Sequence, residues 1–329
     1  MGLSRVVVYG LVSLCLFASP VLAADDKPED LKAELATHSE TKPLDISFQK
    51  LSAMCLHPDG TLWATDEQAK TIKVITADGE VAKTIDLSFA PESLEVASDG
   101  TVYCGGQGQV ALLKSTGELV KVGKIPPEKP TLSASPRHNR PQRVSGLAVL
   151  GDDLFVAYGS SWSVRSLSNL YRFDRRVENP VRIVEELRGC CQRCDIVARD
   201  GVIYVAENAR HRISMFDRDG KDLGNWGNRE RTGLEGFGAC CNPMNLCFDN
   251  DGVLYTSESG LGRVKAYKPD GKMLGLVGYT AVERFVRASH LASSCSNIAI
   301  AMTPDADKIY VMDYKENLIR VLVRKEPAS

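Results

Sequence analysis

The chain has 329 residues, of which 43% are hydrophobic and 25% are charged. This is the composition of a globular protein, and the length suits one large or two medium domains. With 40 Lys and Arg residues against 42 Asp and Glu residues, the formal net charge at pH 7 is −2. That balance excludes the strongly basic surface on which nucleic-acid binding depends, so we expect no nucleic-acid partner.

The first 23 residues have the pattern of a secretory signal peptide. Arg5 supplies a positive charge, Val6 to Phe17 is an apolar run, and Ala23 is the small residue at which cleavage is expected. The run is too short, and too broken by Gly10 and Pro20, for a membrane anchor. No later stretch is apolar for long enough to cross a bilayer, so no membrane span is expected. We predict that the mature chain is periplasmic or extracellular.

Residues 24–43 are charged and poor in aromatic side chains. Such a composition cannot bury enough apolar surface to fold, so we predict a flexible leader here. The following residues, 44–326, are predicted to form one repeating domain.

A tight turn followed by an apolar and an aromatic residue recurs six times in that domain. The pairs are Leu62-Trp63, Val102-Tyr103, Leu154-Phe155, Ile203-Tyr204, Leu254-Tyr255 and Ile309-Tyr310. Successive turns are 40 to 54 residues apart, which is the length of four short strands with their turns. Four of the turns are Asp-Gly, a sequence that favours the positive φ angles of tight hairpins. The repeat therefore predicts an all-β fold, a six-bladed β-propeller.

The sixth repeat supplies only three clear strands before the chain ends. We predict that residues 44–47 add its fourth strand, which closes the ring and covers the sheet edges. An acid also recurs three residues after the aromatic position, as Asp66, Glu207, Glu258 and Asp313. Because it repeats with the blade, we expect it to bond a turn in each blade rather than to form a single calcium site.

The blade pattern resembles the NHL repeat. The fifth blade matches best, from Asn242-Pro243 through the Asp251-Gly252 turn and Leu254-Tyr255 to Glu258 and Arg263-Val264. The Gly-His and Trp-Asp signatures of WD40 repeats are absent. Exported bacterial proteins of the NHL type include a subgroup with a similar Cys-Cys-Asn-Pro stretch, which stands here at residues 240–243. The resemblance implies the propeller fold and implies no activity.

Nine cysteines follow the signal peptide, and three of them share one position in the repeat. Cys190, Cys241 and Cys295 each lie ten residues before the turn of their blade. In an NHL-type blade this position is the loop that leads into the innermost strand, beside the central channel. We therefore expect three successive blades to direct thiols toward one rim of the ring.

The chemistry of these thiols is left open by the sequence. A metal or iron–sulfur cluster can be held by a set drawn from Cys190, Cys191, Cys194, Cys240, Cys241 and Cys295, since thiolates favour zinc, copper(I) and such clusters. Disulfide staples, for example between Cys191 and Cys240, are the alternative expected in an oxidising compartment. Thiol–disulfide redox chemistry, with thiolates favoured by Arg188 and Arg193, is a third reading. Cys55, Cys104 and Cys247 are expected to be small core residues.

A binding function follows from the loops. Three long loops, 126–142, 228–238 and 278–294, all lead into inner strands, so they gather on the cysteine-bearing face. We predict a protein or small-molecule partner at that face. The alternative is a disulfide-stapled scaffold that recognises proteins without a cofactor. A hydrolase or lyase is disfavoured, because the five histidines share no register and no Gly-x-Ser-x-Gly elbow or phosphate loop occurs.

Overall fold

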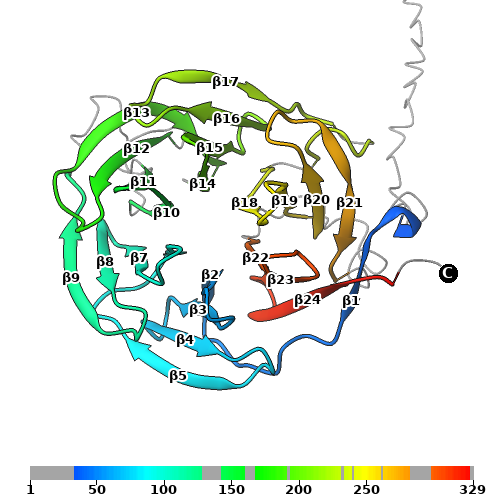
Figure 1. Cartoon of the computed structure of the whole chain (residues 1–329), viewed down its shortest axis with the longest axis horizontal. Coiled ribbons are helices and arrows are strands. Elements are labelled where there is room, and N and C mark those ends of the chain that lie inside the picture. The colour runs from blue at the N-terminus through cyan, green and yellow to red at the C-terminus, as the bar shows by residue number, and fades with distance from the viewer. Residues whose placement is uncertain are drawn as a thin grey trace, which may run out of the picture.

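The computed structural model describes residues 33–127, 142–159, 167–190, 193–230, 233–238, 241–260, 262–281 and 298–326. Within these residues, six four-stranded antiparallel sheets are arranged in a ring around a central axis (Figure 1). Apart from one short 3-10 helix, η2 (Ala33–Leu35), the described elements are all strands. The predicted all-β, six-bladed β-propeller is confirmed. No helix in the described ranges is long and apolar enough to cross a membrane.

Each blade runs from an inner strand to an outer one. The inner strands are β2 (Leu51–Leu56), β6 (Ser93–Val96), β10 (Val144–Leu150), β14 (Ile196–Arg199), β18 (Asn245–Phe248) and β22 (Ile300–Met302). The second strands are β3 (Leu62–Asp66), β7 (Val102–Gly106), β11 (Asp153–Gly159), β15 (Val202–Glu207), β19 (Leu254–Glu258) and β23 (Lys308–Asp313). The third strands are β4 (Thr71–Ile75), β8 (Gln109–Leu113), β12 (Leu167–Asp174), β16 (Arg212–Phe216), β20 (Arg263–Tyr267) and β24 (Leu318–Arg324). The outer strands are β5 (Val81–Asp86), β9 (Leu119–Lys124), β13 (Val181–Arg188), β17 (Asp222–Trp226), β21 (Met273–Tyr279) and β1 (His38–Thr41).

The six apolar–aromatic pairs all lie on second strands. These strands are buried on both faces because neighbouring blades pack against them; in β3 and β7 every residue is buried. The turns before them have the expected backbone, with φ of 88° at Gly60 and 82° at Gly100. Local turn chemistry thus sets the start of each second strand, and apolar burial between blades holds it.

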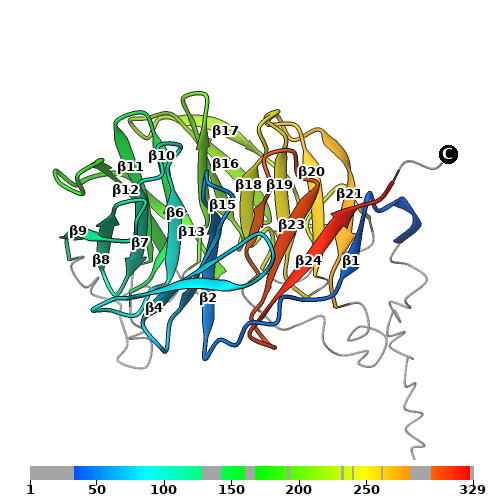
Figure 2. The same ribbon diagram turned by 60° about the horizontal axis from the view of Figure 1, so that its bottom comes forward.

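The ring is closed by the N-terminal segment, but not by the predicted residues. Strand β1 pairs with β24, from His38 opposite Arg324 to Thr41 opposite Val321, and it lies beside β21 of the neighbouring blade (Figure 2). Residues 44–47 form no strand. The closing strand therefore falls inside the segment predicted to be a flexible leader, and both the closure and the leader's end are corrected by this pairing.

Specific polar contacts explain why this segment is ordered. His38 is buried, and its Nε2 lies 2.7 Å from the carbonyl oxygen of Ala306. Glu40 lies 2.8 Å from the guanidinium of Arg320. Because the strand has no alternating apolar pattern, these long-range contacts could not be read from the local sequence.

The acid that recurs after the aromatic position has the predicted structural role. Asp66, Glu207, Glu258 and Asp313 are all buried, and each accepts at least one backbone N–H bond. The bonds to Asp66 and Glu258 come from segments that lead into inner strands. The bond to Glu207 comes from Arg188 at the end of β13, and the bond to Asp313 from the turn after β23. The repeated carboxylate therefore fixes the loops at one end of the blades.

Candidate ligand pocket beside the inner strands

One face of the ring collects polar side chains from several blades. It is the face at which the inner strands begin, and we call it the pocket face. Glu92, Arg143 and Arg193 lie just before β6, β10 and β14, and Glu67 directly follows β3. Because the first two strands of a blade are antiparallel, the end of β3 and the start of β2 are at the same face. Residues from different blades thus meet there.

A pocket of about 400 Å³ opens on this face. Its walls are formed by Glu67, Ala90, Glu92, Gln107, Gln142, Arg143 and Tyr158, which come from the first three blades. A volume of this size holds a small molecule rather than a macromolecular segment.

The two carboxyl groups of the pocket have different environments. The guanidinium of Arg143 lies 3.1 Å from Glu67 and 3.7 Å from Glu92. Burial raises the pKa of Glu92 above its usual value, despite the opposing charge of Arg143. Burial would also raise the pKa of Glu67, but the hydrogen bond from Lys50 and the charge of Arg143 lower it overall. Glu67 is therefore the firmly ionised partner, while Glu92 takes up a proton more readily.

Gln142 offers an unused hydrogen-bond donor in the pocket wall. Its Oε1 accepts a bond of 2.5 Å from the hydroxyl of Tyr158. Its Nε2 is buried and has no hydrogen-bond partner among the described residues. A buried donor left without a partner costs free energy, so its presence beside a pocket points to an acceptor on a bound molecule.

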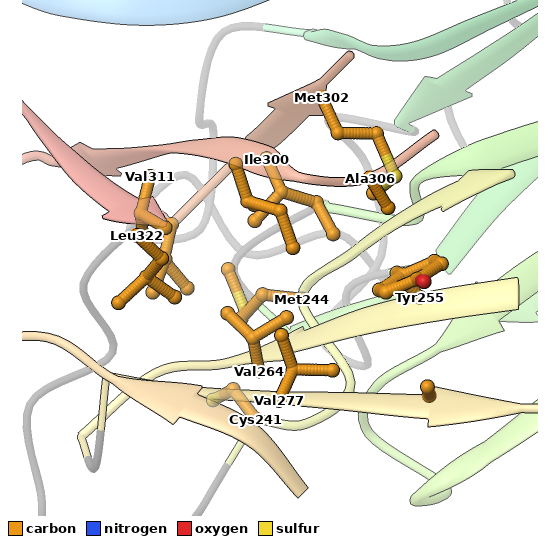
Figure 3. Packing of buried hydrophobic residues seen from close by; sticks show 13 residues of the cluster. Cys241, Met244, Tyr255, Val264, Val277, Ile300, Met302, Ala306, Val311 and Leu322 are labelled. Carbon is orange, nitrogen blue, oxygen red and sulfur yellow. The ribbon is translucent and has the colours of Figure 1, made fainter. Parts of the chain in front are cut away.

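Of the cysteines predicted to form one site, the three in the described residues divide between two apolar clusters. Cys241 and Met244 belong to an apolar cluster where blades five and six meet (Figure 3). Cys190 packs against this cluster. Cys194 belongs to another cluster between blades three and four, and burial raises the pKa of its thiol. Cys191, Cys240 and Cys295 lie outside the described residues. The metal, disulfide and redox readings stay predictions.

In the ranges that the structure describes, no group of three or more His, Cys, Asp or Glu side chains is arranged to hold a metal ion. Cys104 is fully buried, as predicted. Cys55 and Cys247 differ from the prediction, because they are only half-buried at the edges of two apolar clusters. Their inner-strand positions place them near two carboxyl groups, Glu95 and Asp195, which the sequence analysis did not identify.

Comparisons with solved structures support the fold. A gluconolactonase of Xanthomonas campestris superposes with a TM-score of 0.60 at 14% identity, covering 90% of this chain and 92% of that one. A calcium-binding protein of Agrobacterium tumefaciens, regucalcin, has a TM-score of 0.56 at 15% identity, covering 89% and 96%. A virginiamycin B lyase of Staphylococcus aureus has a TM-score of 0.51 at 15% identity, covering 89% of each chain.

No protein-family model matches the sequence, and no curated protein is found as a relative. At 14 to 15% identity the solved structures establish the shared propeller architecture. They do not transfer an activity, because the same fold carries unrelated chemistries.

Proposed function

We propose that this protein is an exported binding propeller that holds a small polar molecule in the pocket of the pocket face. The observation that carries the proposal is the buried Nε2 of Gln142, which has no partner within the described residues although Gln142 belongs to a pocket wall rich in polar side chains. Tyr158 fixes the amide through its Oε1, so the donor is preoriented for a ligand.

The pocket favours binding over a cysteine-based function. Its polar groups come from three blades and converge on one volume, as small-molecule sites do. Cys190 and Cys194 instead pack in two different apolar clusters, which gives a metal or redox role no comparable support. A count of free thiols and a metal analysis on anaerobically purified protein would test that separate prediction.

A pocket-filling substitution tests the proposed function. Ala90 lines the pocket and is half-buried, so Ala90→Phe places a ring in the ligand volume. Ala82→Phe adds the same ring to the exposed outer strand β5 and serves as the matched control. Saturation-transfer NMR with a defined set of small acids, amides and polyols should give fragments that bind the wild type and the control but not Ala90→Phe. If every fragment that binds also binds Ala90→Phe, the pocket is not the binding site.

A further inference from the structure

A second arginine, Arg193, lies on the pocket face outside the residues that line the pocket. The side chain of Arg193 makes no hydrogen bond or ion pair with any residue in the described part of the chain. It is half-buried, yet it interacts with the charges of Arg143, Glu67 and Glu92. Burial, followed by the charge of Arg143, lowers the pKa of Arg193 to about 10, so the guanidinium is still protonated at neutral pH.

The backbone around Arg193 is held firmly although its guanidinium is not. Its N–H donates to the carbonyl oxygen of Cys190 at 3.2 Å. Ser145 of the third blade accepts a bond from the N–H of Cys194 at 3.1 Å and donates to the carbonyl of the same residue at 2.8 Å. A Cβ atom at Gly189 would clash with the carbonyl of Arg193, so glycine is needed for this tight turn. The turn thus fixes the position from which the guanidinium extends.

The positive and negative charges of the described residues at the pocket face do not balance. Among the described residues, three cationic groups, Lys50, Arg143 and Arg193, face two carboxyl groups, Glu67 and Glu92. Two guanidinium groups held near each other repel, and this repulsion is relieved when an anion is shared between them. Within the described residues this leaves one positive charge in excess, which an anionic ligand would neutralise.

We infer that the pocket binds a small monocarboxylate, with its carboxylate between Arg193 and Arg143 and another acceptor atom on Nε2 of Gln142. This inference rests on the proposed function and names the ligand class. A guanidinium presents paired donors that match a carboxylate or a phosphate. A monoanion is favoured over a phosphate dianion because Glu67 and Glu92 repel additional negative charge.

Three small molecules distinguish the effect of ligand charge on binding from the effect of ligand shape. Propionate carries the carboxylate, propionamide is its neutral counterpart of nearly the same shape, and inorganic phosphate is the competing anion. Titrations followed by saturation-transfer NMR, with phosphorus NMR for phosphate, should show propionate binding at least about tenfold tighter than propionamide, which corresponds to about 1.4 kcal/mol. Phosphate should bind more weakly than propionate.

Substitutions test whether the preference for propionate depends on the guanidinium of Arg193. Arg193→Gln should weaken propionate binding by about tenfold or more and leave propionamide binding unchanged, whereas Arg193→Lys should retain part of the preference. Glu92→Gln removes a negative charge and should strengthen propionate binding. Arg218→Gln, an exposed arginine paired with Asp153 in the turns at the other end of the blades, is the matched control and should change nothing. Melting temperatures of all variants verify that each is folded.

The outcomes distinguish the two proposals. Propionate and propionamide could bind equally tightly, lose binding in Ala90→Phe and keep the same affinity in Arg193→Gln. In that case the pocket is a binding site, and the inference that it selects a carboxylate is overturned. If phosphate binds through Arg193 while propionate does not, the ligand class is wrong. If none of these probes and no other fragment depends on the pocket, the proposed function itself fails.

Discussion

Two buried carboxyl groups, Glu95 in inner strand β6 and Asp195 directly before β14, lie in an environment that disfavours their charged forms. Burial, followed by the charge of Asp195, raises the pKa of Glu95 to about 8. Burial raises the pKa of Asp195 to about 7, although the backbone N–H of Leu246 bonds its carboxyl group. Near neutral pH the two acids therefore share protons that free carboxyl groups would have lost.

Replacing Glu95 by Gln should flatten the dependence of stability on pH. The folded pKa is about 8 and the unfolded value is near 4.5, so the folded state binds this proton more tightly. The stability it contributes is complete below the unfolded pKa and is lost as the pH rises through the folded pKa. Allowing for its partial exposure, we expect the wild type to lose about 2 kcal/mol more than Glu95→Gln between about pH 5 and about pH 8.5.

Urea unfolding at the two pH values measures this difference. Glu80→Gln, which removes an exposed carboxylate from the turn after β4, is the matched control and should follow the wild type. Parallel pH profiles for the wild type and Glu95→Gln would show that Glu95 is ionised in the folded protein throughout this range.

At the scale of elements, strand β1 decides whether the ring is closed. It covers the free edge of β24, and Thr37 donates a backbone bond to Leu276 of β21, so it joins two blades. An uncovered edge would expose the unpaired backbone groups of β24 to solvent and to other chains.

Two truncations test this closure. A chain that begins at Ala33 keeps β1 and the contacts described above, so its urea midpoint should equal that of the mature protein. A chain that begins at Pro43 lacks β1, and it should unfold at a much lower urea concentration or aggregate through the exposed edge. Equal midpoints for the two chains would mean that β1 contributes nothing to closure.

A strand could be predicted from the sequence where the residues that fix it are close together in the chain. The six second strands were predictable because Asp-Gly turns and apolar–aromatic pairs act within a few residues. Strand β1 was missed because His38 and Glu40 are fixed by Ala306 and Arg320, at the opposite end of the chain.

The pocket was missed for a related reason. Gln142 and Arg143 stand just before β10 and Arg193 just before β14, and these residues do not repeat with the blade. A search for repeats identifies residues that occur in every blade. A ligand site is instead formed by residues that differ from blade to blade. The sequence does show charged residues just before inner strands, such as Arg143 and Arg193. Their positions indicate a shared site only after the blades are arranged in a ring.

For the whole molecule, at least one hydrogen bond between neighbouring blades occurs at every junction around the axis. In chain order the pairs are Ser52 with Pro91, Glu92 with Val144, Ser145 with Cys194, Asp195 with Leu246, Asn245 with Ile300, and Asn317 with Leu51. In each pair a side chain of one blade bonds the backbone of the next. The apolar clusters between blades supply nonspecific burial, and these directional bonds add a fixed register between adjacent blades.

Asn245 of the fifth blade bonds both neighbouring blades through its side chain, and it provides the sharpest test. Its Nδ2 donates to Asp195 of the fourth blade at 2.7 Å, and its Oδ1 accepts from the N–H of Ile300 in the sixth at 2.8 Å. Asn245→Ala removes both bonds and leaves the N–H of Ile300 without its partner, so we expect a loss of about 2 to 3 kcal/mol in the free energy of unfolding. Asn225→Ala, on the exposed outer strand β17, should change it by less than about 0.5 kcal/mol. Urea unfolding followed by tryptophan fluorescence measures both, and equal effects of the two substitutions would show that apolar packing alone sets the register of the blades.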